Sequence, residues 1–415
     1  MEFETFHVHE PDERHAFGLY VHIPFCARKC PYCDFTVVVN ARREELAYVA
    51  ALERELAVRR GEFPEHLATI YVGGGTPGIL EVPAVDALGD MFRRHLSLDS
   101  LGEFTVEFNP EHATPDRLRA WRRAGATRVS LGVQALSEDA LKLLGREHNA
   151  AMIAAAIAHA KEAGFLHISI DFIFGLPGIS PSVTAEDVRQ GIAIPGVDHV
   201  SMYELTIEQR TAFGVQARRG ELRPASDDAL ITQWRALTQL VEAAGFQRYE
   251  VSNYARPGAR AQHNASYWTG RPYLGIGVSA ASLRLDDARN EIERRANARP
   301  IKGYLEDPLA GATTEVLGPA DFLGELLTLG LRTRDGVDLR ALERRFGLRL
   351  SAVRDVLREL CLLRWVRESS PGSLRFGSTD EGMEIADSLA LQALDALDKD
   401  LSACQTPLRV YPSES

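Results

Sequence analysis

The sequence predicts an α/β protein: a partial (βα)6 barrel followed by a C-terminal helical, winged-helix-like domain. Short runs rich in β-branched and aromatic residues alternate with helical stretches, which is typical of βα units and a parallel sheet. The residues with the most unusual chemistry directly follow these runs. From about residue 300 the alternation gives way to successive helices and one hairpin. An open doubly wound sheet is the alternative arrangement of the same βα units.

Six strands are predicted in the first part of the chain, which is too few for a complete eight-stranded barrel. The helix after the third strand is the best marked. Thr114 is a capping residue, Pro115 suits the first helical position and Gly125 can close the helix. The predicted strands cover residues 18–25, 68–75, 103–110, 128–134, 167–175 and 199–205.

The C-terminal part has the outline of a winged-helix module, which raises DNA binding as a possible class of function. Residues 336–400 carry ten basic and twelve acidic residues with no basic stripe, so the charge argues against it. Its helices are predicted at 319–332, 338–346, 351–364 and 380–398, with a hairpin between the last two. We therefore divide the chain into an N-terminal extension (1–17), the barrel with its extension (18–300), the C-terminal domain (301–400) and a flexible tail (401–415).

Composition indicates a soluble globular chain. Its 415 residues are 45% hydrophobic and 25% charged, with a net charge of −11 that opposes broad attraction to nucleic acid. No apolar run approaches the roughly 20 residues of a membrane span, and the N-terminus is acidic rather than signal-like. We expect a cytoplasmic protein with no integral membrane segment and no nucleic-acid partner.

Three of the five cysteines lie within eight positions, as Cys26, Cys30 and Cys33 in the stretch CARKCPYCDF. In a reducing compartment such a cluster indicates metal or redox chemistry rather than disulfides. A zinc site would need a fourth ligand, for which His22 or Asp34 is available. An iron-sulfur cluster with three thiolates would leave one iron open to another ligand. The spacing favours the cluster, and zinc remains the alternative.

Other unusual residues follow or end the later strands. In βα barrels the carboxyl ends of the strands form one ligand-binding face, so residues spread over about 180 positions are expected to surround one site. After the thiols and strand one, these residues are Gly73–Pro77, Glu107 and Asn109, Gln134, Asp171, and Tyr203 with Glu204.

These motifs carry a specific resemblance. The C-x3-C-x2-C spacing with an aromatic before the last Cys resembles the radical S-adenosylmethionine (SAM) superfamily. YVHIPFCARKCPYCDF, YVGGGTP, VEFNPE, SLGVQ, LGR, DFIFGLPG, YELTIEQRTAFG, YEVSNYARPG and HNASYW, in this order, resemble the HemW-type heme chaperones of the HemN group. The similarity extends from about residue 18 to 390. It implies a radical-SAM barrel carrying a 4Fe-4S cluster, SAM and heme as cofactors.

The resemblance also implies residue roles. Cys26, Cys30 and Cys33 would hold the cluster, and His263, Tyr267 and Trp268 of HNASYW would contact heme. A packed loop with a locally bonded His263 is the alternative for the last group. The SAM contacts would be Tyr20, Tyr32, Gly74, Gly75, Thr76, Glu107, Gln134, Arg146 and Asp171. Glu107 would accept from the SAM amine, Arg146 would pair with its carboxylate and Asp171 would accept from the ribose.

The sequence departs from the HemN-type dehydrogenases at two places. Asp34 and Phe35 follow Cys33 where those enzymes carry a further cysteine, and residues 275–283 lack a histidine present in many relatives. We therefore expect a heme chaperone that passes heme to acceptor proteins. A SAM-dependent enzyme acting on a tetrapyrrole (coproporphyrinogen III dehydrogenase or methylase) and a zinc-stabilised regulatory protein are the alternatives. An electron donor such as a flavodoxin or ferredoxin is an implied partner.

Overall fold

The computed structural model describes residues 16–39, 44–286, 289–404 and 408–410 of the chain. Most of the predicted N-terminal extension, with His7, His9 and His15, lies outside the described residues. Of the predicted tail, residues 401–404 and 408–410 are described.

All six predicted strands are present and run parallel. Their order in the sheet follows their order in the sequence, without the reversal that defines a doubly wound sheet. The prediction of a partial barrel is therefore confirmed over the doubly wound alternative. The strands are β1 (Ala16–Ile23), β4 (His66–Gly74), β5 (Glu103–Phe108), β6 (Arg128–Gln134), β7 (His167–Phe174) and β8 (His199–Glu204).

The sheet extends beyond these six strands at both edges. A parallel strand, β11, pairs with β1 on the side opposite β4, and antiparallel strands continue from it and from β8. Strand β14 covers Thr313–Leu317, just before the first helix of the C-terminal module. The added strands are β9 (Gln247–Arg248), β10 (Asn253–Ala255), β11 (Tyr273–Ile276), β12 (Ala281–Asp286), β13 (Glu291–Ala296) and β14 (Thr313–Leu317).

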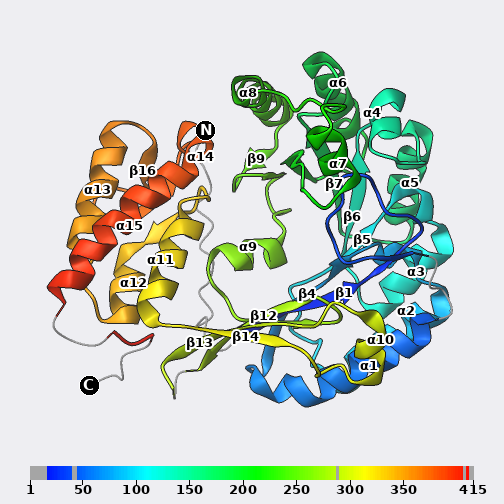
Figure 1. Ribbon diagram of the computed structural model, residues 1–415, viewed down its shortest axis with the longest axis horizontal. Coiled ribbons are helices and arrows are strands. Elements are labelled where there is room, and N and C mark those ends of the chain that lie inside the picture. Colours follow the sequence, from blue (N-terminus) through cyan, green and yellow to red (C-terminus); the bar gives the residue numbers. More distant parts are fainter. Residues whose placement is uncertain (1–15, 40–43, 287–288, 405–407, 411–415) are drawn as a thin grey trace.

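Helices cover the outside of this sheet, and apolar residues of strands and helices form one core between them (Figure 1). The predicted helix at 114–125 is α3. Its Pro115 opens the helix and Gly125 closes it with φ +110, but the Thr114 side chain makes no capping hydrogen bond. The helices are α1 (Glu45–Arg59), α2 (Val82–His95), α3 (Pro115–Ala124), α4 (Glu138–Leu143), α5 (Ala150–Glu162), α6 (Pro181–Ile192), α7 (Ala212–Arg218), α8 (Asp227–Ala243), α9 (Gln262–Trp268) and α10 (Ile301–Glu306).

The C-terminal module has its own core, built from the apolar faces of its helices and from Leu283 and Ile292 of the extended sheet. The predicted helices and hairpin are confirmed, although the last helix divides at Ile385. A strand before α12 joins the hairpin in a three-stranded sheet. The elements are α11 (Pro319–Gly330), β15 (Val337–Asp338), α12 (Leu339–Phe346), α13 (Ser351–Leu362), β16 (Val366–Glu368), β17 (Arg375–Ser378), α14 (Asp380–Glu384) and α15 (Ala386–Ala403).

Figure 1 shows this module beside the barrel, with α9 between the two bodies. None of the helices in the described ranges combines the length and the apolar character that crossing a membrane requires.

Candidate functional site

The thiol loop follows β1 at the carboxyl face of the barrel. Cys26 ends the two-residue strand β2 (Phe25–Cys26), which pairs with β3 (Val38–Val39) beyond the loop. The amide of Cys33 donates to the carbonyl of Cys30 across 3.2 Å, which forms a turn. Helix α7 supports the loop, because the Phe213 amide donates to Pro31 O across 3.0 Å and its ring lies 6.4 Å from that of Tyr32. These contacts hold the thiol loop against α7.

A chain of hydrogen bonds joins two of the thiols through residues of three other elements. The Arg146 Nη1 donates to Cys30 Sγ (3.6 Å), and its Nη2 donates to Asn109 Oδ1 (2.8 Å) and Gly132 O (2.6 Å). Asn109 Nδ2 donates to Thr76 Oγ1 (3.4 Å), which lies 3.5 Å from Cys26 Sγ. The structure thus brings the predicted residues Thr76 and Arg146 onto the thiol loop. It adds Asn109, which the predicted ligand set omits.

The three thiols at this loop fit an iron-sulfur cluster with one open iron, and one of the two candidate fourth ligands for zinc is already used. Burial raises the pKa of Cys26 to about 11 and also raises the pKa of Cys33, so a cation is needed to favour the thiolates. The charge of Arg146 lowers the pKa of Cys26, and the charge of Lys29 lowers the pKa of Cys33. His22 is not available as a zinc ligand, because its Nε2 donates to Thr36 O and its Nδ1 lies 3.1 Å from Tyr20 Oη. Within the described ranges, no three His, Cys, Asp or Glu side chains gather around a position for one metal ion.

The glycine run after β4 lies against the start of the thiol loop. Gly74 has φ +112, and a Cβ there would lie 2.6 Å from the His22 ring; one on Gly75 would lie 2.8 Å from Phe25 O. The Gly75 amide donates to Ile23 O, and the Thr76 amide donates to Phe25 O, each across 2.8 Å. The glycines therefore allow two backbone segments to pack closely, and these two amides are already used in that packing.

Two carboxylates face each other in the barrel interior below the thiols. Burial raises the pKa of Glu107 to about 7, although hydrogen bonds from Tyr71 and Gly74 oppose that rise. Burial also raises the pKa of Asp171 to about 6, opposed by hydroxyls of Ser201 and Ser130. The Ser130 Oγ lies 3.2 and 3.3 Å from the two Asp171 oxygens. Both predicted SAM ligands therefore lie in one interior, each with a donor that favours its charged form.

Gln134 and Tyr20 complete the described SAM set. Gln134 has φ +65 at the irregular end of β6, and its Nε2 lies with the Arg146 guanidinium over Gly132, where a Cβ would be 2.9 Å from either. Such a conformation is uncommon for a residue with a side chain, and it aims Gln134 back over the site. The Tyr20 ring stacks on Tyr71 at 6.1 Å within the barrel.

The HNASYW segment forms α9, which lies at the opposite end of the barrel from the thiols. The amides of Gln262 and His263 donate to Glu103, the first residue of β5, across 3.1 and 3.0 Å. The Gly18 position near the start of β1 also packs on the His263 ring. Helix α9 is therefore the floor of the barrel, and it does not share a face with the thiol loop.

His263, which the resemblance suggests as a heme contact, lies inside the barrel with both ring nitrogens hydrogen-bonded to the protein. It is 0% exposed, with Nδ1 2.8 Å from Thr69 Oγ1 and Nε2 2.9 Å from Tyr267 Oη. Burial lowers its pKa to about 4, so the ring is neutral. Both ring nitrogens are already used, as the packed-loop alternative predicts. Tyr267 and Trp268 are half-buried at the end of the helix.

Tyr71 is the second site residue that the predicted set omits, besides Asn109. Its hydroxyl donates to Glu107 Oε1 across 2.6 Å. The sequence carries a signal for it, because Tyr71 lies two positions before the glycine run and alternation along β4 places it on the same face as Thr69 and Gly73. Asn109 was visible at the end of its strand but had no predicted partner.

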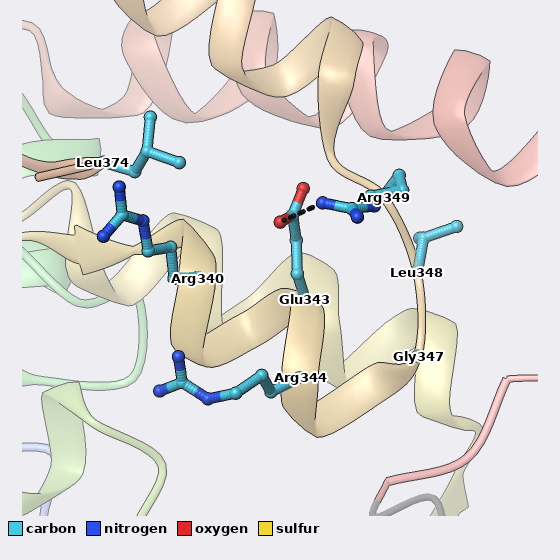
Figure 2. A pocket seen from close by; sticks show the side chains of 7 residues that line it. All are labelled: Arg340, Glu343, Arg344, Gly347, Leu348, Arg349 and Leu374. Atoms are coloured by element: carbon cyan, nitrogen blue, oxygen red, sulfur yellow. Dashed lines mark ion pairs between the residues drawn. The ribbon is translucent and has the colours of Figure 1, made fainter. Parts of the chain in front are cut away.

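A shallow pocket of about 460 Å³ lies on the C-terminal module, apart from all predicted site residues. Figure 2 shows three arginines around it, Arg340, Arg344 and Arg349, the last paired with Glu343 at 3.5 Å. Arg340 also donates to Gly372 O at the hairpin. The lining is completed by Gly347, Leu348 and Leu374.

Two known families match parts of this chain. Residues 20–190 match the Radical SAM superfamily, and residues 317–368 match the HemN C-terminal domain. The first match contains the thiol loop and both interior carboxylates, and the second covers most of the helices before the hairpin.

Several curated relatives are similar over most of the chain. A Heme chaperone HemW of Mycobacterium tuberculosis is 38% identical over 336 residues, covering 79% of this chain and 84% of the relative. Heme chaperone HemW of Escherichia coli (strain K12) is 38% identical over 297 residues, covering 70% and 75%. Heme chaperone HemW of Lactococcus lactis is 34% identical over 332 residues, covering 79% and 84%.

Among solved structures, the coproporphyrinogen III oxidase HemN from Escherichia coli superposes with a TM-score of 0.76, covering 92% of this chain and 90% of that one. The two sequences are 22% identical, so this likeness shows a shared fold.

Proposed function

Because this chain belongs to the HemW family of heme chaperones within the radical SAM superfamily, we propose that it carries a SAM-bound 4Fe-4S cluster, binds heme and transfers it to acceptor proteins. The family implies SAM and the cluster. The proposal adds the residues that hold them, a cytoplasmic location and an electron donor such as a flavodoxin or ferredoxin.

Cys26, Cys30 and Cys33 would hold the cluster. Three thiolates leave one iron without a protein ligand, and the bound cluster supplies there a position for the amine and carboxylate of SAM and an electron for its reductive cleavage. Arg146 would stabilise negative charge next to Cys30, and Thr76 Oγ1 lies 3.5 Å from Cys26 Sγ.

The observation that carries the proposal is the unused donor of Arg146. Its Nε is buried and makes no hydrogen bond to any described residue, while Nη1 and Nη2 are held by Cys30, Asn109 and Gly132. A buried, unpaired guanidinium N–H beside three thiols favours an anionic ligand. The carboxylate of SAM would be such a ligand.

The remaining SAM contacts would come from the strands of the barrel and the loops that follow them. Glu107 would accept from the amine and Asp171 from the ribose hydroxyls, each already held by donors from neighbouring strands. Tyr20, Tyr32, Gln134 and the backbone of Gly74, Gly75 and Thr76 would shape the space around the ligand. The glycine amides contribute through packing, since those of Gly74 and Gly75 already donate within the protein.

Heme would contact the half-buried edge of α9 at Tyr267 and Trp268. His263 would serve as an axial ligand only after giving up a hydrogen bond to Thr69 or Tyr267. We therefore propose that heme is held without this imidazole as its resting ligand.

The experiment compares heme transfer with catalysis on one preparation. Anaerobically reconstituted protein loaded with heme is mixed with apomyoglobin, and the Soret band of myoglobin reports transfer. In parallel, coproporphyrinogen III is incubated with the protein, SAM and a reductant. We expect heme transfer and no protoporphyrinogen. Two results together contradict the chaperone function: catalytic formation of protoporphyrinogen, and heme binding no tighter than that of an unrelated protein.

A further inference from the structure

Tyr71 on β4 and Glu107 on β5 form a short side-chain contact between two neighbouring strands in the barrel interior. Tyr71 Oη donates to Glu107 Oε1 across 2.6 Å, and Gly74 N donates to Glu107 Oε2 across 3.0 Å. Both donors come from β4, so each carboxylate oxygen has one fixed partner. A carboxylate accepts about four hydrogen bonds, which leaves capacity for an ammonium group.

The Tyr71 ring is held from two sides. The Tyr20 ring of β1 stacks on it with centroids 6.1 Å apart and 26° between planes. The His263 ring of α9 lies 5.2 Å away with 32° between planes, and His263 is itself fixed by Thr69 and Tyr267. The hydroxyl therefore cannot turn away from Glu107 without moving the barrel floor.

We infer that Tyr71 is a positioning residue for SAM, which aims the Glu107 carboxylate and keeps it charged for the SAM ammonium group. This inference rests on the proposed function, because it assigns Glu107 to that amine. It gives the HNASYW helix a role in SAM binding, since His263 supports Tyr71 from below.

The surroundings of Glu107 oppose its negative charge, so the hydrogen bond from the Tyr71 hydroxyl is needed to favour the charged form. The titratable groups that face this carboxyl are Tyr20 on β1, Tyr71 on β4, Asp171 on β7, Tyr203 on β8 and Tyr267 on α9. Burial raises the pKa of all four tyrosines, so they stay neutral, and ionised Asp171 adds negative charge. With burial and Asp171 both opposing the charge on Glu107, its pKa is about 7 even with the Tyr71 bond in place.

The sign of the pH dependence follows. Glu107 is charged above its pKa and loses its charge as the pH falls through that value, so SAM affinity should fall with it. Removal of the Tyr71 hydroxyl removes a bond that lowers this pKa. In Tyr71→Phe the loss of affinity should therefore begin at a higher pH.

The first measurement is the SAM dissociation constant of cluster-loaded protein between pH 6 and 9, as wild type, Tyr71→Phe, Glu107→Gln and Tyr273→Phe. The ratio of the variant's dissociation constant to that of wild type at each pH cancels the effect of the titration of SAM itself. We expect Tyr71→Phe to bind about tenfold more weakly at pH 7, with the ratio shrinking toward pH 9. Glu107→Gln should be weak at every pH. Tyr273→Phe removes a hydroxyl from a ring that contacts Tyr267, and it should match wild type.

The second measurement needs neither SAM nor cluster. Difference infrared spectroscopy follows the protonated carboxyl band that Glu107→Gln removes, and this band should titrate at a higher pH in Tyr71→Phe. Equal affinity of Tyr71→Phe and wild type at all pH values overturns the inference, as does an unshifted band. If wild-type protein fails to bind SAM, the proposed function fails, while the infrared band still decides whether Tyr71 controls the charge on Glu107.

Discussion

Arg146 and Cys30 lie 116 positions apart in the sequence, and their side chains meet with Nη1 3.6 Å from Sγ. The same guanidinium bonds Asn109 at the end of β5 and Gly132 in β6. One side chain therefore fixes the thiol loop to two strand ends, and its Nε remains available to a ligand.

Replacement of Arg146 tests this relationship. Arg146→Ala should weaken SAM binding by about tenfold to a hundredfold, because a charge-assisted hydrogen bond contributes about 1.5 to 3 kcal/mol. Arg146→Lys keeps the charge but not the fork of donors, so it should recover only part of the affinity. Calorimetric titration of cluster-loaded protein measures both. Arg93→Ala, which replaces an exposed arginine of α2, is the control. SAM affinity unchanged in Arg146→Ala would exclude the proposed contact.

Replacement of the thiols tests the cluster. Cys26→Ala, Cys30→Ala and Cys33→Ala should each lose most of the bound iron together with the visible charge-transfer absorption, because each removes one of three protein ligands. Cys361→Ala and Cys404→Ala, which lie in the C-terminal module, should retain both. Iron and sulfide analysis after anaerobic reconstitution makes the comparison. A triple variant that loses zinc and no iron would establish the zinc alternative.

The two interior carboxylates should separate SAM binding from cluster binding. Glu107→Ala and Asp171→Ala should each weaken SAM binding by about tenfold to a hundredfold and leave the iron content intact. Each removes an acceptor in the barrel interior, and neither is a thiol-loop residue. Wild-type SAM affinity in both variants would refute the placement of SAM across β5 and β7.

His263→Ala should affect stability and not heme ligation. Removal of the imidazole leaves the hydroxyls of Thr69 and Tyr267 without their partner, which should lower the free energy of unfolding by about 1 to 3 kcal/mol. Urea unfolding followed by circular dichroism measures this cost. The Soret maximum of heme-loaded protein should stay at the wild-type wavelength. A displaced maximum in a folded variant would instead make His263 a heme ligand.

The buried pair Arg128–Glu103 should anchor the floor helix. Arg128 Nε donates to Glu103 Oε2 across 2.9 Å, and both side chains are almost fully buried. Arg128→Ala leaves the Glu103 charge buried without its partner. The free energy of unfolding should therefore be about 3 to 5 kcal/mol lower than in wild type. The exposed Arg94–Glu53 pair is the matched control, and Arg94→Ala should lower the free energy of unfolding far less than Arg128→Ala does. Equal losses in the two variants would contradict the anchoring role.

The candidate site was predictable where the residues are attached to strand ends. Strand position along the chain and the right-handed βα connection determine which end of the sheet a residue reaches. The sequence therefore predicts that Glu107, Gln134 and Asp171 lie in one barrel, with Asn109 beside Glu107. The partner of Asn109 and the role of Tyr71 needed the packed structure, because each acts through a hydrogen bond to a residue more than 30 positions away.

The sequence by itself determined the six parallel strands, the thiol loop and the order of the C-terminal helices, because hydrophobic periodicity and turn residues are local signals. Only the tertiary structure decided that β11 pairs beside β1, that α9 closes the barrel floor, and that both nitrogens of His263 are used there. These features depend on which distant surfaces meet. A histidine on a short helix presents the same local pattern whether its ring faces solvent, a ligand or a buried tyrosine.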